Sequence, residues 1–137
     1  MPDVPVPAIV DEFLARPNPA IVATLRRDGS PHSVPTWYDW EDGRALLNMD
    51  ESRLRLSQLR RDPRASLTVL DVDGWYRHVS LFGTVVSIYD DSELTDIDRL
   101  AVRYTGRPFG GRQSRRVSAW MVPDRWHGWD DAGPWPF

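Results

Sequence analysis

Residues 20–40, AIVATLRRDGSPHSVPTWYDW, decide the fold. Ala20–Leu25 is an apolar run typical of a strand, and Asp28-Gly29 suits a tight hairpin turn. A second strand is predicted from His32 to Trp40, where residues alternate with a period of two. One set is His32, Val34, Thr36, Tyr38 and Trp40, and the other is Ser33, Pro35, Trp37 and Asp39. Pro35 interrupts this strand, and because proline has no backbone N–H to donate, it belongs at a sheet edge or beside a gap that faces a ligand.

The remaining sequence continues this pattern of strands and turns around short helices. Further strands are predicted at Ala45–Met49, Ala65–Val72, Trp75–Tyr89 and Val117–Val122, with a seventh short piece at Trp126–Trp129. Helices are predicted at Pro7–Ala15, at Arg53–Arg61 with Asp50 or Ser52 as N-cap, and from Asp91 or Ser92 to Gly106. A small sheet of this kind cannot safely leave its edges open. We therefore predict one domain over residues 1–137, a small antiparallel β-barrel of six or so strands with helical caps.

Composition removes several classes of function. The 137 residues include no cysteine, which excludes disulfides, thiolate nucleophiles and the usual structural zinc sites. All 17 basic residues are arginine, so no lysine is present to form a Schiff base with pyridoxal phosphate. The net charge of −3 argues against a general nucleic-acid binder. No apolar run approaches the roughly 18 residues of a membrane span, and no secretion signal is recognisable, so we expect a cytoplasmic protein.

An anion site is predicted where a strand ends and a helix begins, at Ser52, Arg53 and Arg55. Arginines in a first helical turn oppose the helix dipole, and a bound anion removes that penalty. Free backbone N–H groups, the Ser52 hydroxyl and the two guanidinium groups together suit a phosphate. The alternative is that the two arginines pair with Asp50 and Glu51.

A flat ligand is predicted to stack near Pro35 and Trp37, with its phosphate reaching the arginines. The alternative is an edge-strand proline beside a core or interface tryptophan. His78 is a candidate proton donor or else a histidine at the barrel rim, and the three histidines lack the paired spacing of a metal site. Seven tryptophans exceed what one small core is expected to hold, and three of them, Trp126, Trp129 and Trp135, suggest a homodimer interface.

The order of these features resembles the split-barrel family of pyridoxamine 5'-phosphate oxidase, in particular the small members that use the deazaflavin coenzyme F420. The resemblance covers nearly the whole chain, from Ala20–Leu25 through Pro35-Thr36-Trp37-Tyr38, Ser52-Arg53-Leu54-Arg55 and Leu59–Ser66 to Tyr104–Pro108. It implies a six-stranded antiparallel split β-barrel that forms a homodimer, with cofactor sites at the subunit interface. In the oxidases of the family that bind flavin phosphate, lysine follows the first arginine, whereas Leu54 stands here, which favours the F420 branch.

The resemblance also implies a site and a reaction. The cofactor ring is expected along Pro35, Thr36 and Trp37, with Asn48 and Met49 beside it, and the phosphate on Ser52, Arg53 and Arg55. Trp75, Arg77 and His78 are expected to reach the site across the dimer. The implied function is hydride transfer from reduced F420 to a planar unsaturated small molecule, and no residue is assigned as essential for catalysis. The alternatives are an FMN-binding oxidoreductase of the same fold and a non-catalytic protein that carries such a cofactor or a tetrapyrrole.

Overall fold

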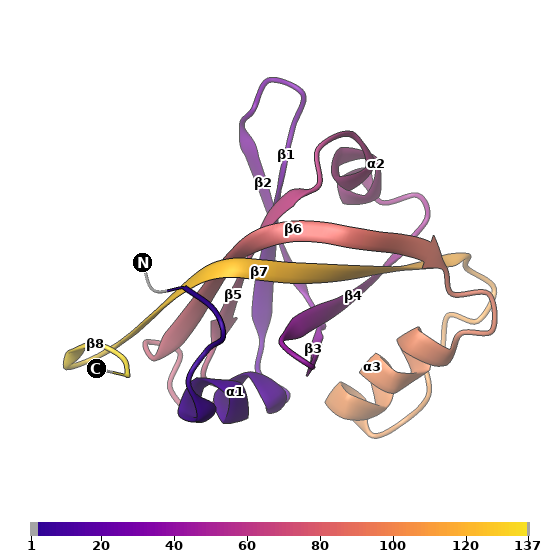
Figure 1. Cartoon of the computed structure of the whole chain (residues 1–137). Coiled ribbons are helices and arrows are strands. Elements are labelled where there is room, and N and C mark those ends of the chain that lie inside the picture. The colour runs from indigo at the N-terminus through magenta and orange to yellow at the C-terminus, as the bar shows by residue number, and fades with distance from the viewer. Residues whose placement is uncertain (1–2, 137) are drawn as a thin grey trace.

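All eight strands that the structure describes belong to one antiparallel sheet. The structure is a computed structural model that describes residues 3–136 (Figure 1). The strands are β1 (Ala20–Leu25), β2 (Pro31–Thr36), β3 (Asp39–Glu41), β4 (Arg44–Asp50), β5 (Arg64–Leu70), β6 (His78–Asp90), β7 (Arg116–Asp130) and β8 (Gly133–Pro134). Their order is β2-β1-β5-β6-β7-β4-β3, and β8 pairs with β7. The mainly β, antiparallel fold class is thereby confirmed.

The sheet curls without closing through hydrogen bonds. Its two end strands, β2 and β3, do not pair with each other, yet they are consecutive in the chain and only Trp37 and Tyr38 separate them. This arrangement is a split barrel. The prediction of one strand over His32–Trp40 is therefore wrong, since the chain leaves one sheet end at Thr36 and enters the other at Asp39.

Tyr38 explains why the strand breaks there. Its side chain is fully buried, and its hydroxyl donates to the carbonyl oxygens of Leu14 (2.7 Å) and Arg16 (3.1 Å) at the end of the first helix. Burial raises the pKa of this hydroxyl, so it stays a donor at neutral pH. A regular strand would instead present Tyr38 on the same face as its neighbours two positions away.

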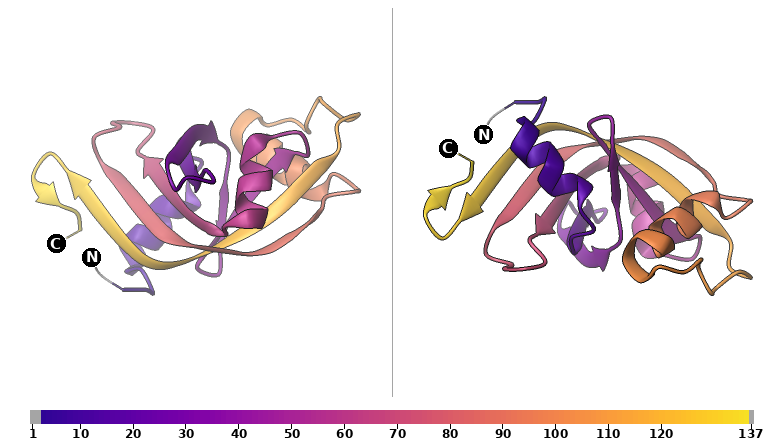
Figure 2. Two further views of the ribbon diagram at one scale, coloured as in Figure 1. Left: turned by 90° about the horizontal axis from the view of Figure 1, so that it is seen from above. Right: turned by 90° about the horizontal axis from the view of Figure 1, so that it is seen from below.

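The predicted strands Val117–Val122 and Trp126–Trp129 are one continuous strand, β7, which pairs with β6 over most of its length (Figure 2). Pro123 lies within this strand although proline donates no ladder hydrogen bond. In the structure it lies opposite Gly83, where the register of β6 shifts. A Cβ atom at Gly83 would lie 2.1 Å from the Val122 carbonyl oxygen, so only glycine allows this approach.

Within residues 3–136 three helices pack against the sheet, α1 (Ala8–Ala15), α2 (Leu54–Arg61) and α3 (Thr95–Thr105). In Figure 1, α1 and α3 lie below the β6–β7 ribbon and α2 lies above it. The predicted N-caps of α2 are wrong, because the Asp50 carboxylate accepts from the Ser52 backbone N–H and hydroxyl, and Arg53 occupies the N-cap position. The prediction that Asp91 or Ser92 begins α3 is also wrong in position, because Leu94 occupies the N-cap, although the Asp91 carboxylate accepts from the backbone N–H groups of Asp96 and Ile97.

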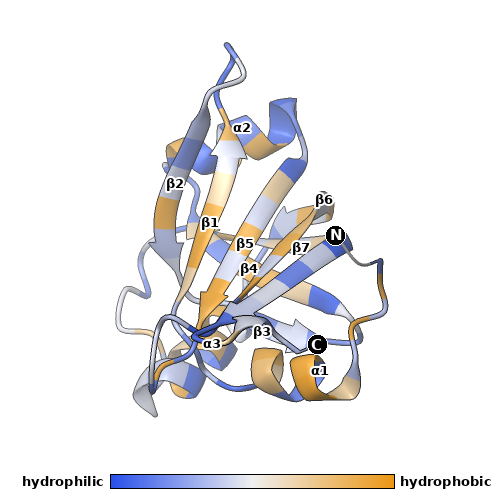
Figure 3. Cartoon of the chain, turned by 90° about the vertical axis from the view of Figure 1, so that its left-hand side faces the viewer, coloured by the Kyte–Doolittle hydropathy of each residue, from blue (hydrophilic) through white to orange (hydrophobic). Residues whose placement is uncertain are grey.

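The core lies inside the curled sheet and includes two of the three tryptophans expected at an interface. Trp126 and Trp135 are 5% and 7% exposed, so the interpretation of these two as interface anchors is wrong, whereas Trp129 remains 38% exposed. Figure 3 shows hydrophobic residues along β1, β5 and α1 and hydrophilic residues at the tip of the β1–β2 hairpin. Among the described residues, no helix has the length and apolar composition of a membrane span.

The Arg103 side chain on α3 ties the helices to the strand joint. It is 13% exposed and forms an ion pair with Asp39 at 3.1 Å. Its Nε donates to the Tyr38 carbonyl oxygen at 2.9 Å. Its Nη atoms donate to three carbonyl oxygens at the end of α1, those of Leu14, Ala15 and Arg16.

We predict that Arg103→Met lowers the free energy of unfolding by about 2 to 4 kcal/mol, because four carbonyl oxygens around the strand joint and the partly buried Asp39 carboxylate each lose a donor. Urea denaturation followed by tryptophan fluorescence measures this change. Arg107→Met is the matched control: its exposed guanidinium has no hydrogen bond or ion pair within residues 3–136, so the change should stay within about 0.5 kcal/mol. Equal unfolding curves for the two variants would contradict the role of Arg103.

Candidate functional site

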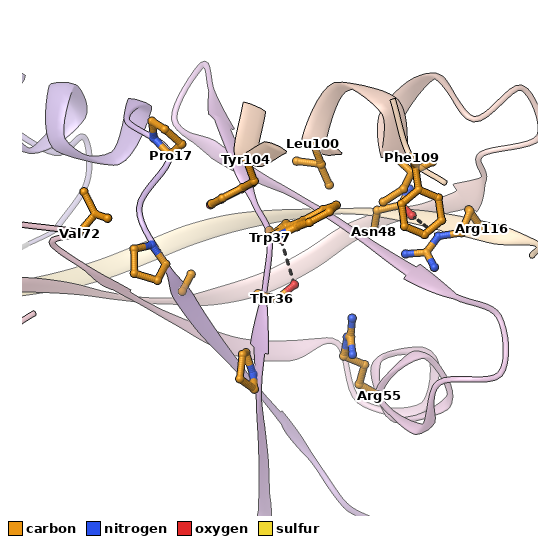
Figure 4. A pocket seen from close by; sticks show the side chains of 14 residues that line it. Pro17, Thr36, Trp37, Asn48, Arg55, Val72, Leu100, Tyr104, Phe109 and Arg116 are labelled. Carbon is orange, nitrogen blue, oxygen red and sulfur yellow. Dashed lines mark hydrogen bonds between the residues drawn. The ribbon is translucent and has the colours of Figure 1, made fainter. Parts of the chain in front are cut away.

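A cleft of about 640 Å³ opens beside the joint between β2 and β3 (Figure 4). This volume is in the range of sites for cofactors and other small ligands, roughly 300 to 1,000 Å³. Most of its walls come from three segments, namely the β2 end with the joint, the residues before β1, and α3 with the loop that follows, and single residues of β4, α2, the β5–β6 turn and β7 complete them. The lining residues are Pro17, Pro19, Ala20, Pro35, Thr36, Trp37, Asn48, Arg55, Val72, Ile97, Leu100, Tyr104, Phe109 and Arg116.

One wall of the cleft is aromatic. The rings of Trp37 and Tyr104 stack, with centres 5.6 Å apart and planes 7° apart. Phe109 meets Trp37 edge to face at 6.5 Å. The Tyr104 hydroxyl donates to the Asn18 carbonyl oxygen (2.7 Å), which holds the ring in place, and burial raises its pKa. The wall is therefore rigid and flat, and it suits a planar ligand.

The opposite end of the cleft is cationic. Figure 4 shows Arg55, from α2, and Arg116, at the start of β7, at the same end of the cleft. Arg55 is half-buried, and within residues 3–136 its guanidinium has no hydrogen bond or ion pair. Burial lowers its pKa, and the charges of Arg53 and Arg116 lower it further. This concentration of like charge favours an anion as the missing partner.

Asn48 connects this cationic end to α3. It is 4% exposed, and its amide nitrogen donates to Asp91 (3.1 Å) and to Ser118 (3.0 Å). Its Oδ1 accepts from Arg116 Nε at 3.0 Å. The side chain of Asn48 thus borders the cleft mainly as a support for Arg116.

The structure brings together five of the eleven residues that the sequence predicted for the site, namely Pro35, Thr36, Trp37, Asn48 and Arg55. Pro35 lies on an end strand of the sheet and also faces the cleft, as its missing donor predicted. Met49 does not belong to the lining, because β4 turns it into the core, where it is 1% exposed. Ser52 and Arg53 are exposed next to the cleft without lining it, and the Ser52 hydroxyl is bound to Asp50 at 2.7 Å.

Of the other three predicted residues, Trp75 and Arg77 line a different hollow beside the β5–β6 turn, and His78 follows them as the first residue of β6. Trp75 is 70% exposed, and Arg77 pairs with Asp130 at 3.2 Å. The His78 Nδ1 is 2.7 Å from the Tyr76 carbonyl oxygen, and its ring lies 5.9 Å from that of His127. Their approach to a cleft from a second subunit stays a prediction.

Several lining residues were not predicted, above all Arg116, Phe109 and Leu100. Tyr104 had been noted only as part of a helix face and of the resemblance. A signal for Arg116 exists in hindsight, because antiparallel pairing of β4 with β7 places it opposite Asp50, next to the predicted anion site. Phe109 follows a glycine-stopped helix, and its position depends on contacts such as the hydrogen bond from its N–H to Asp98 at 2.9 Å.

Comparison with known proteins agrees with this architecture. An F420 reductase of known structure is 26% identical, with a TM-score of 0.79, over 88% of this chain and 98% of that one. A conserved hypothetical protein from Mycobacterium tuberculosis is 28% identical, with a TM-score of 0.71, over 93% and 86% of the two chains. HupZ from Group A Streptococcus, at 14% identity and a TM-score of 0.68 over 95% and 98% of the chains, shares the fold. The family model described as pyridoxamine 5'-phosphate oxidase matches residues 6–130, and the chain therefore belongs to the pyridoxamine 5'-phosphate oxidase family.

Proposed function

We propose that the protein binds the deazaflavin coenzyme F420 in this cleft and acts as a reductase of planar unsaturated small molecules. The observation that carries the proposal is the half-buried guanidinium of Arg55, which has no partner within residues 3–136, at one end of a cleft with a flat aromatic wall. The similarity to an F420 reductase over 88% of the chain supports the choice of cofactor.

The residues present fit such a cofactor. Trp37 and Pro35 offer apolar surface for a ring system, and Arg55 with Arg116 offers donors for a phosphate. The hydroxyl of Thr36 donates to the Trp37 carbonyl oxygen at 2.9 Å, which stiffens the joint behind the ring. A cleft with one flat wall and one cationic end matches a molecule with a ring at one end and a phosphate at the other.

When bound, reduced F420 supplies a hydride, and the chain's own part is to bind and orient. Among the described residues that line the cleft there is no carboxylate and no imidazole. The Tyr104 hydroxyl donates to Asn18, and its pKa is raised by burial, so it is a poor acid. We therefore infer that any proton the reduced substrate needs comes from solvent, unless His78 of a second subunit supplies it.

Two other functions compete for the same cleft. An FMN-binding oxidoreductase would use the same wall and the same cationic end. A non-catalytic carrier of a flavin, deazaflavin or tetrapyrrole would bind without turnover. A preference for FMN over F420 in binding would indicate the FMN-binding oxidoreductase. Tight binding without turnover of quinones and enones by reduced F420 would indicate the non-catalytic carrier.

We also propose a homodimer in the cytoplasm. The exposed side chains of Trp75, Tyr76 and Trp129 support a protein interface, since large aromatic residues are enriched at interfaces. Sedimentation at micromolar concentration tests this. A species at the monomer mass of 15.8 kDa would contradict both the dimer and any site shared between subunits.

We predict that F420 binds more tightly than FMN and quenches the fluorescence of Trp37. Parallel titrations with the two cofactors, followed by tryptophan emission, measure the preference. In Trp37→Phe the quenching should fall strongly while an aromatic ring still lines the cleft, which shows that the signal comes from this site. Tighter binding of FMN would select the flavin alternative, and binding of neither would refute a cofactor site.

We further predict that Arg53→Ala and Arg55→Ala each weaken F420 binding by roughly 1 to 3 kcal/mol, as expected for the loss of a charge-assisted hydrogen bond to phosphate. The melting temperature of Arg55→Ala should not fall, because its guanidinium has no partner among the described residues and is repelled by its neighbours. Arg60→Ala is the matched control, since Arg60 is exposed on the same helix and outside the cleft lining. Unchanged F420 affinity in both Arg53→Ala and Arg55→Ala would contradict the proposed phosphate site.

A further inference from the structure

Arg116 lies at the cationic end of the cleft and is held there by two contacts. Its Nε donates to Asn48 Oδ1 at 3.0 Å. Its guanidinium carbon lies 4.8 Å from the centre of the Phe109 ring, so one face of the group is covered. An arginine bound in this way keeps the donors of both Nη atoms. Within residues 3–136 these donors form no hydrogen bond or ion pair.

The Asn48 side chain that supports Arg116 is itself held by hydrogen bonds. Both donor positions of the Asn48 amide are used, one by Asp91 and one by Ser118, which leaves only Oδ1 toward Arg116. The Asp91 carboxylate in turn accepts from backbone N–H groups at the start of α3. A buried network in which every polar group has a hydrogen-bond partner favours one arrangement of its side chains. The orientation of the Arg116 guanidinium is therefore set by the fold.

We propose that Arg116 is a third anion-binding residue of this cleft, positioned by Asn48, and that with Arg55 it binds a phosphoryl group of the ligand. The inference rests on the proposed function only in placing that ligand in the cleft. Arg55 and Arg116 project from different elements, α2 and β7, toward the same end of the cleft (Figure 4). A tetrahedral phosphate presents oxygens in several directions, whereas a carboxylate presents two in one plane, so phosphate fits two guanidinium groups of separate origin.

The neighbouring residue shows what an arginine does here when it has no ligand to bind. Arg115 is exposed and pairs with Asp90 at 2.7 Å and with Glu51 at 3.5 Å. Arg116 is half-buried one position later, where burial and the charge of Arg53 lower its pKa, and the charges of Asp50 and Asp91 only partly compensate. An anion at the Nη atoms supplies the missing compensation.

The first experiment uses inorganic phosphate as the probe and needs no cofactor. Phosphate at constant ionic strength should raise the melting temperature of the wild-type protein, and acetate should raise it much less. Arg116→Met should weaken phosphate binding roughly ten- to a hundredfold. Arg115→Met carries the same charge change and should keep the wild-type response. A wild-type phosphate response in Arg116→Met overturns the proposal, as does an equal response of the wild type to acetate.

The positioning role of Asn48 needs its own readout. Asn48→Ala should weaken phosphate binding in the wild-type background and have no further effect in Arg116→Met, because the two side chains act through one contact. Arg116→Lys tests the same point without opening the buried network: it keeps the charge but loses Nε, and should bind phosphate several-fold more weakly than the wild type. Equal losses from Asn48→Ala in both backgrounds, or wild-type affinity in Arg116→Lys, overturn the positioning role.

The outcome is separable from that of the proposed function. If phosphate binding depends on Arg116 while neither F420 nor FMN binds, the inference holds and the proposed function fails. If F420 binds equally well to the wild type and to Arg116→Met, the proposed function holds and the inference fails.

Discussion

The burial of Tyr38 at the joint between the two ends of the sheet is the constraint on which the rest of the structure depends. Its hydroxyl donates to the last carbonyls of α1, and Arg103 from α3 donates to its backbone oxygen and to the same helix end. One short segment of chain thus connects two sheet edges and two helices. Trp37, the residue before Tyr38 in this joint, packs against Tyr104 and forms part of the cleft wall. The cleft exists because the barrel is split at this point.

The two ends of the cleft differ in how the fold treats their side chains. At the aromatic end, Trp37 and Tyr104 pack against each other and the Tyr104 hydroxyl has a partner, so this wall contributes to stability as well as to shape. At the cationic end, Arg55 and Arg116 keep donors without a partner among the described residues, and the two charges repel each other. Placing unpaired like charges in a half-buried cleft is unfavourable for folding. Such an arrangement is typical of a binding site, where local stability is given up for affinity.

Much of the fold follows from local pattern. Strand β1 was predicted with its observed ends, and the hairpin turn, the helix stop at Gly106 and the split-barrel class are confirmed. Most of the errors come from contacts between segments far apart in the chain, whereas the N-cap error at α2 comes from local hydrogen bonds between Asp50 and Ser52. Tyr38 breaks a regular alternation because it bonds to α1, and Pro123 fits within β7 because Gly83 lies opposite. Trp126 and Trp135 are buried in a core whose capacity cannot be counted from composition.

For the site, the amino-acid sequence by itself determined the chemistry that is available: a proline and a tryptophan two residues apart, arginines at the start of a short helix, and no lysine or cysteine. Local spacing is enough for this, because these residues are close in the chain. Only the tertiary structure decided that Arg116, Tyr104 and Phe109 join them, and that Met49 and Ser52 do not line the cleft. The reason is that a cleft between a strand joint, a helix and a distant strand is defined by packing and register, and these depend on the whole chain.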